Sequence, residues 1–231
     1  MKIGIIGAGN IGGALTRRFR AAGHQVAIAN SRGPETLQDL ADETGATPGS
    51  AREAVSGAKV VVVSIPLRNI PDLPTDLFAS APADLVVIDT SNYYPQQRDG
   101  KLEGIEDGGT ESGWVEQHLG RPVVKAFNSI LATHLQDMGK PAGAPGRVAL
   151  AVAGDDPKAK ATVMALIDGI GFDAVDAGSI ADSWRQQPGT PGYLKDYDIA
   201  GVRRALADAK YERAPEWRGT PNSPGTFDSP A

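Results

Sequence analysis

Two short stretches of the sequence have residue types and spacings that suit a phosphorylated cofactor. The first is a GxGxxG pattern that begins at Gly7, with an apolar run before it and a helical pattern after it. Its first glycine permits a tight turn, its second lets backbone approach a pyrophosphate, and its third lets helix and strand pack closely. The helix N-terminus would face the phosphates with free N–H groups. The predicted contacts are Gly7, Gly9, Asn10, Ile11 and Gly12.

The second stretch, Asn30-Ser31-Arg32, follows the second apolar run. A protein that binds NAD usually has Asp or Glu there, which accepts hydrogen bonds from the ribose and would repel a 2′-phosphate. Here no acid is present. Asn30 and Ser31 offer neutral donors, and the guanidinium of Arg32 suits a phosphate. This ending predicts NADP as the cofactor, although Arg32 as a solvated surface residue is the alternative.

Three further groups are predicted to lie at the carboxyl edge of the sheet, where open α/β sheets bind ligands. They are Ser64-Ile65-Pro66, Thr90-Ser91-Asn92 and Asn128-Ser129. Pro66 suits an apolar wall beside a nicotinamide, or simply a turn that ends a strand. The amides of Asn92 and Asn128 suit a carboxamide or a substrate carbonyl, or could cap the helices that follow.

No residue type nominates a strong acid, base or nucleophile, because the sequence has no GxSxG, HExxH, Walker lysine or SYxxxK pattern. The catalytic residues are therefore left unknown. Lys125 lies inside an apolar run, from which its amine could reach the site or extend to the sheet edge. Such a site suits hydride transfer between two cofactors, where the protein mainly positions the rings.

The elements that must position these residues alternate between β-branched runs and helical patterns, which predicts βαβ units. We expect one sheet with strands at Lys2–Gly7, Gln25–Ala29, Lys59–Ile65, Leu85–Asp89, Pro122–Ala126, Arg147–Ala153 and Phe172–Asp176. Helices are expected at Asn10–Ala22, about Pro34–Thr44 and about Pro157–Ile170, and surface loops at Asp99–Gly113 and Met138–Gly146. The predicted fold class is a Rossmann-type, doubly wound, mainly parallel α/β sheet with a short C-terminal extension.

Composition narrows the class of protein. The 231 residues suffice for one sizeable core, and the net charge of -5 suggests neither nucleic acid nor an anionic membrane as a partner. The sequence has no cysteine, and its three histidines stand far apart, so we expect no metal site. The apolar start is too short for a membrane span and unlike a signal peptide, so a cytoplasmic location is expected.

These residues resemble a known family. The runs KIGIIGAGNIG, NSR, VVVSIP and especially Val124-Lys125-Ala126-Phe127-Asn128-Ser129-Ile130 are similar to the F420-dependent NADP reductases and to the reductase domains of STEAP metalloreductases. The resemblance covers roughly residues 1–176. It implies one Rossmann domain that binds NADP(H) and exchanges hydride with a flavin or a deazaflavin such as F420. It also implies cofactor contacts at residues 7–12, 30–32, 64–66 and around Asn128.

The end of the chain departs from that family and resembles a bacterial branch of uncertain substrate. We expect a Rossmann domain over residues 1–178, a helical segment over 179–211 that completes the site, and a flexible tail over 212–231. Trp184 and Arg185 could stack on a planar ligand, or Trp184 could close the core.

Two other functions remain open. One is reduction of a small imine or carbonyl, since the N-terminus also resembles pyrroline-carboxylate reductases and hydroxyacid dehydrogenases. The other is a non-catalytic NADP sensor. A site without its own lid favours a homodimer.

Overall fold

The computed structural model describes residues 1–211 and 225–230. Within this part of the chain, six parallel strands form a sheet in the order β3-β2-β1-β4-β5-β6. They are β1 (Lys2–Ile6), β2 (Gln25–Ala29), β3 (Thr47–Gly49), β4 (Val60–Val63), β5 (Val86–Asp89) and β6 (Val124–Lys125). The order reverses at β1, so the carboxyl ends of β1 and β4 flank the crevice where such sheets bind ligands. The predicted Rossmann-type class is confirmed; the short edge strand β3 was not expected.

Helices cover both faces of this sheet, because its central strands are apolar on both sides. On one face Ile3, Ile5 and Val62 pack with apolar residues of α1 (Asn10–Ala21), α6 (Ala132–Asp137) and α7 (Pro157–Gly169). On the other face Val61 and Val63 pack with those of α3 (Ala51–Val55), the 3₁₀ helix η2 (Leu67–Asp72) and α5 (Glu111–Leu119). The expected helix at Pro34–Thr44 consists of a 3₁₀ turn, η1 (Pro34–Leu37), followed by α2 (Gln38–Thr44).

Two expectations are wrong. The strands β7 (Ala149–Val152) and β8 (Asp173–Asp176) do not extend the main sheet but form a parallel pair of their own. One antiparallel bridge, between Lys125 and Ala153, joins this pair to the main sheet, so β7 runs against β6. The stretch Asp99–Gly113 is not simply a surface loop, since it contains α4 (Glu103–Glu106) and the buried start of α5.

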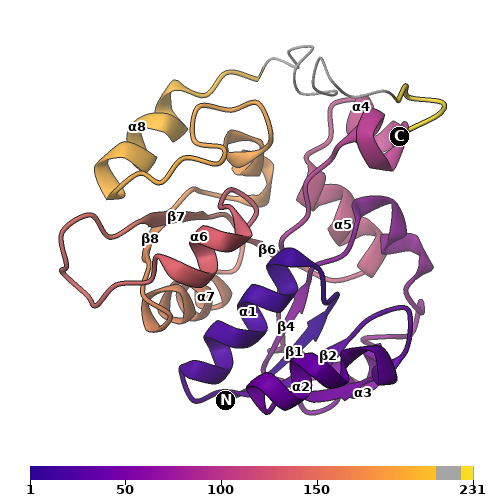
Figure 1. Ribbon diagram of the computed structural model, residues 1–231. Helices are drawn as coiled ribbons and strands as arrows, with labels where there is room; N and C mark the ends of the chain where they lie inside the picture. Colours follow the sequence, from indigo (N-terminus) through magenta and orange to yellow (C-terminus); the bar gives the residue numbers. More distant parts are fainter. Residues whose placement is uncertain (212–224, 231) are drawn as a thin grey trace.

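The C-terminal part of the described chain returns over the β7–β8 pair. A short helix η4 (Ile180–Gln186) leads to α8 (Ile199–Asp208), whose Val202 packs on β7 and β8. Figure 1 shows α8 beside this pair, away from α2 and α3 of the N-terminal half. Most of the predicted tail, residues 212–224 and 231, lies outside the described residues. None of the helices described is long and apolar enough to cross a membrane.

Candidate functional site

The glycine-rich loop between β1 and α1 shows three glycines with three different requirements. Gly7 has a φ of 108°, and a Cβ there would lie 2.1 Å from the carbonyl oxygen of Ser64. A Cβ on Gly12 would lie 1.9 Å from the carbonyl oxygen of Gly7. Gly9 has an ordinary φ of -73°, and a Cβ there would meet no atom of the described residues within 4 Å. The fold therefore requires the first and third glycines, whereas the second borders open space.

That open space belongs to a cavity of about 460 Å³ at the carboxyl ends of β1, β2 and β4. Eight of the predicted cofactor contacts line it, namely Gly7, Gly9, Asn30, Ser31, Arg32, Ser64, Ile65 and Pro66. Asn10 lines an adjoining cavity of about 690 Å³ between α1, α2 and α6, whereas Ile11 and Gly12 line neither. The structure thus gathers most of the predicted contacts, from three separate parts of the chain, around one cavity.

The start of α1 has neither a side-chain cap nor an acidic residue in its first turn. Its N-cap is Gly9, which offers no side chain to the first amides. The first N–H groups of a helix lack partners within the helix and carry a partial positive charge. The two cavities meet at this helix end, so a phosphate bound there would lie between them.

The turn after β2 is shaped by Asn30. Its Oδ1 accepts a hydrogen bond from the backbone N–H of Arg32 at 3.0 Å, and its Nδ2 donates to Thr36 at 2.8 Å. The amide of Asn30 therefore organises the turn. The guanidinium of Arg32 is exposed, borders both cavities and has no ion pair or hydrogen bond among the described residues. It is free to bind an external anion.

Sequence reasoning missed the wall of the cavity opposite this turn. Asn69, Asp72 and Leu73 of the η2 region line it, and Asn69 donates a hydrogen bond to the Asp72 carboxylate at 3.3 Å. No motif indicated these residues, because the η2 segment comes to the cavity only through the packing of Leu67 and Ile70 against the sheet.

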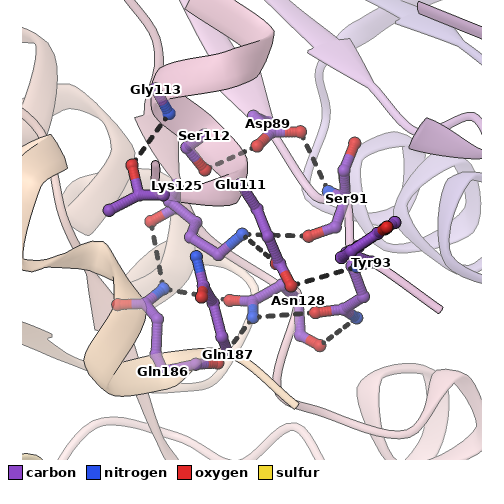
Figure 2. A network of polar contacts seen from close by, with 12 residues as sticks. Asp89, Ser91, Tyr93, Glu111, Ser112, Gly113, Lys125, Asn128, Gln186 and Gln187 are labelled. Atoms are coloured by element: carbon purple, nitrogen blue, oxygen red, sulfur yellow. Dashed lines mark hydrogen bonds and ion pairs between the residues drawn. The ribbon is translucent and has the colours of Figure 1, made fainter. Parts of the chain in front are cut away.

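Asn92 and Asn128 do not line this cavity. Their amides form a pair, in which Asn128 Nδ2 donates to Asn92 Oδ1 at 3.1 Å and Asn92 Nδ2 donates to the Asn128 carbonyl at 2.8 Å. Gln186 completes the arrangement by donating to Asn128 Oδ1 at 2.9 Å (Figure 2). Neither asparagine caps a helix, since α6 is preceded by Leu131 and the turn Pro95–Asp99 by Tyr94. The capping alternative is therefore wrong for both.

Lys125 does not extend to the sheet edge but is completely buried. Its Nζ donates to the Ser91 carbonyl at 2.9 Å and forms an ion pair with Glu111 Oε2 at 3.1 Å (Figure 2). Glu111 was missed because the stretch was predicted to be a loop, although Thr110 before it caps α5 and is a typical helix start. Burial raises the pKa of Glu111, and the charge of Lys125 opposes that rise.

Two tyrosines meet beside this network. The hydroxyl groups of Tyr94 and Tyr193 are hydrogen-bonded to each other, and the Arg98 guanidinium lies 5.2 Å from the Tyr94 ring centroid. Burial raises the pKa of both phenols, so both keep their protons at neutral pH.

Trp184 and Arg185 are engaged within the chain. The Trp184 ring meets Tyr211 edge-on with centroids 5.0 Å apart, and the Arg185 guanidinium lies 4.5 Å from the Trp184 ring centroid. Arg185 also donates to the Leu206 carbonyl in α8 at 3.1 Å. These contacts favour a structural role for Trp184, in which its ring packs within the C-terminal segment and does not stack on a ligand.

Parts of the chain are similar to a family model and to two known proteins. Residues 2–93 match the family model described as NADP oxidoreductase, coenzyme F420-dependent. The protein YjhV of Escherichia coli (strain K12) is 53% identical over 70 residues, 30% of this chain and 51% of YjhV. Metalloreductase STEAP3 of Rattus norvegicus is 28% identical over 183 residues, 79% of this chain and 35% of STEAP3. The chain thus spans about half the length of YjhV and about a third of STEAP3.

A solved structure, the hypothetical protein SMa0349 from Sinorhizobium meliloti, is similar over most of the chain. It is 32% identical with a TM-score of 0.73, and the match covers 85% of this chain and 95% of that one. Fold and cavity together are those of a Rossmann-type α/β protein with a cavity at the point where the strand order reverses. The N-terminal residues 2–93 are similar to the F420-dependent NADP oxidoreductase family, whose model they match. Proteins of that family are NADP-dependent oxidoreductases.

Proposed function

We propose that this protein is an NADP(H)-dependent oxidoreductase that transfers hydride between the nicotinamide and a flavin or deazaflavin-type acceptor. The observation that carries the cofactor choice is the unpaired guanidinium of Arg32, which borders the cavity where a protein specific for NAD would have a carboxylate. A carboxylate would repel a 2′-phosphate, whereas a guanidinium binds it with two parallel hydrogen bonds.

The residues that line the two cavities support this cofactor assignment at its phosphate end. The pyrophosphate would lie over Gly9 against the first N–H groups of α1, Asn10 among them, which no side chain occupies. Ser31 and Arg32 would hold the 2′-phosphate, with Asn30 shaping their turn. The nicotinamide would lie beyond Ser64 and Pro66, toward the segment that contains Asn92 and Asn128.

The bound nicotinamide supplies the hydride chemistry, and the protein's own residues orient it. Pro66 has no N–H and offers an apolar surface beside the ring. The amide pair of Asn92 and Asn128 fixes the carboxyl ends of β5 and β6 relative to each other. Gln186 joins residues 179–211 to this pair, which supports the proposal that the C-terminal segment completes the site.

A second candidate is reduction of a small imine or carbonyl, which requires a proton as well as a hydride. The Tyr94–Tyr193 hydroxyl pair favours it, because a phenol can donate a proton and this pair lies beside the Asn92 segment. NADPH oxidation measured with F420, FMN, FAD, ferric chelates and cyclic imines distinguishes the two candidates. Tight NADPH binding without turnover of any acceptor would indicate a sensor instead.

The cofactor assignment is tested with Arg32→Glu. We expect NADPH affinity to fall by about tenfold or more, the equivalent of one charged hydrogen bond. NADH affinity should change little, because NADH has no 2′-phosphate. Calorimetry with both cofactors measures the two effects, and equal losses would contradict the assignment. The proposal also includes a homodimer in the cytoplasm, and sedimentation with and without NADPH tests the oligomeric state.

A further inference from the structure

The ion pair of Lys125 and Glu111 lies where the carboxyl ends of β5 and β6 meet the start of α5. Both side chains are completely buried, and their charged atoms are 3.1 Å apart. Removing two charges from water costs several kcal/mol for each ion, and an apolar pair of similar volume is often as stable or more so. Stabilisation of the fold is therefore not a sufficient reason for this buried ion pair, and its contacts point to a further role.

Each end of the pair holds one peptide group of the same short segment. Lys125 Nζ donates to the carbonyl oxygen of Ser91 at 2.9 Å. Glu111 Oε1 accepts from the backbone N–H of Tyr93 at 3.1 Å (Figure 2). The cation binds the negative end of the peptide that follows Ser91, and the anion binds the positive end of the next peptide, which precedes Tyr93. Two apolar side chains could fill the same volume but could not hold this backbone.

Asn92 lies between the two held residues. Its side chain is paired with Asn128, and its carbonyl oxygen accepts from Arg98 at 2.6 Å. Next to it, the Oγ of Ser91 is buried and has no hydrogen-bond partner among the residues that the structure describes. A buried hydroxyl without a partner costs free energy, so this group requires a polar partner from a ligand or from water.

We propose that Lys125 and Glu111 are positioning residues: their ion pair fixes the backbone of residues 91–93, so that Asn92 and the Ser91 hydroxyl bind the carboxamide of the nicotinamide. This inference rests on the proposed function, since it requires NADP(H) as the ligand. It makes the nicotinamide half of the cofactor, and not the adenosine half, dependent on the buried pair.

The test compares NADP⁺ with 2′,5′-ADP, which retains the 2′-phosphate and adenosine but lacks the nicotinamide. Calorimetry on Lys125→Met, and on Lys125→Met with Glu111→Leu, gives both affinities, and thermal unfolding gives stability. We expect NADP⁺ affinity to fall by about tenfold in both variants, the equivalent of one or two lost hydrogen bonds. Affinity for 2′,5′-ADP should change by less than about twofold, within the scatter expected of a distant site.

The double variant separates positioning from simple stability. It leaves no unpaired buried charge at positions 125 and 111, so it should unfold at a higher temperature than Lys125→Met. Its NADP⁺ affinity should nevertheless stay low, because neither peptide group is held. Arg147→Met is the matched control, since Arg147 is another buried cation, paired with Asp168 and Asp173 beside the β7–β8 pair. That variant should lose stability and keep both affinities.

Three results would overturn the inference. One is a double variant that regains both its stability and its NADP⁺ affinity. Another is a parallel fall in affinity for NADP⁺ and 2′,5′-ADP. The third is a wild-type protein that binds the two ligands equally well, because the nicotinamide would then contribute nothing. Failure of the wild-type protein to bind either ligand would instead refute the proposed function, and the inference with it.

Discussion

Replacing Gly9 with valine separates ligand binding from folding at one position of the glycine-rich loop. The Cβ added at Gly9 meets no described atom within 4 Å, and the φ of -73° suits any residue. Losing glycine at a helix N-cap costs about 1 kcal/mol. Valine also reduces the conformational entropy of the unfolded chain, which stabilises the folded state by about 0.4–1 kcal/mol. The free energy of unfolding should therefore change by less than about 1 kcal/mol, which is about 2–4 °C in melting temperature for a protein of this size.

Binding should respond very differently. The valine side chain would occupy the space in which the pyrophosphate has to approach the backbone. If two charge-assisted hydrogen bonds are lost, at about 1.5–3 kcal/mol each, the loss is about 3–6 kcal/mol. That corresponds to a fall in NADPH affinity of about two to four orders of magnitude. Calorimetry with NADPH and thermal unfolding of the same sample measure both quantities.

Two other glycines serve as controls for this experiment. A Cβ on Gly169, the last residue of α7, also meets no atom of the described residues within 4 Å, so Gly169→Val should bind NADPH normally. A Cβ on Gly12 would lie 1.9 Å from a backbone oxygen, so Gly12→Ala should lose stability as well as binding. A folded Gly9→Val protein with wild-type NADPH affinity would refute the assignment of the glycine-rich loop to the pyrophosphate.

Two further predictions concern the C-terminal segment. Trp184→Ala removes a half-buried aromatic ring and should lower the free energy of unfolding by about 2 kcal/mol. NADPH affinity, measured by calorimetry, should not change. Loss of acceptor turnover without loss of stability would instead place Trp184 at the site that binds the hydride acceptor. Hydrogen bonds from the Ser179 hydroxyl and backbone N–H lower the pKa of Asp182 in the folded protein. Ionised Asp182 therefore stabilises the fold at pH values above its unfolded-state pKa of about 3.9. This stabilisation is lost as the pH falls through the lower folded-state pKa. NMR titration should show Asp182 titrating below that value and returning toward it in Ser179→Ala, and a wild-type midpoint at or above it would contradict the expected contacts.

The sequence predicted the N-terminal half of the fold well, because the signals there are local. A parallel strand buried on both faces is a continuous apolar run, and β4 is VVVV. The GxGxxG motif contains its own turn, helix start and packing contact, so the local structure that it adopts depends on few residues outside it. The pairing of β7 with β8 alone was not predictable, because an apolar run shows that a strand is buried but not which neighbour it joins.

The candidate site divides in the same way. The sequence alone determined the proposed phosphate end, since the three glycines and the missing acid at Asn30-Ser31-Arg32 are read from adjacent residues. Only the tertiary structure decided the surroundings of Lys125, because Glu111, Ser91 and Gln186 come from separate parts of the chain and meet through packing. A sequence does not show that a charged side chain is buried unless its partner can be identified. The partner of Lys125 is Glu111, which lies in a stretch rich in glycine and acidic residues that was predicted to be a loop. The physical reason is that backbone geometry is encoded locally, whereas the electrostatic environment of a side chain depends on contacts across the fold.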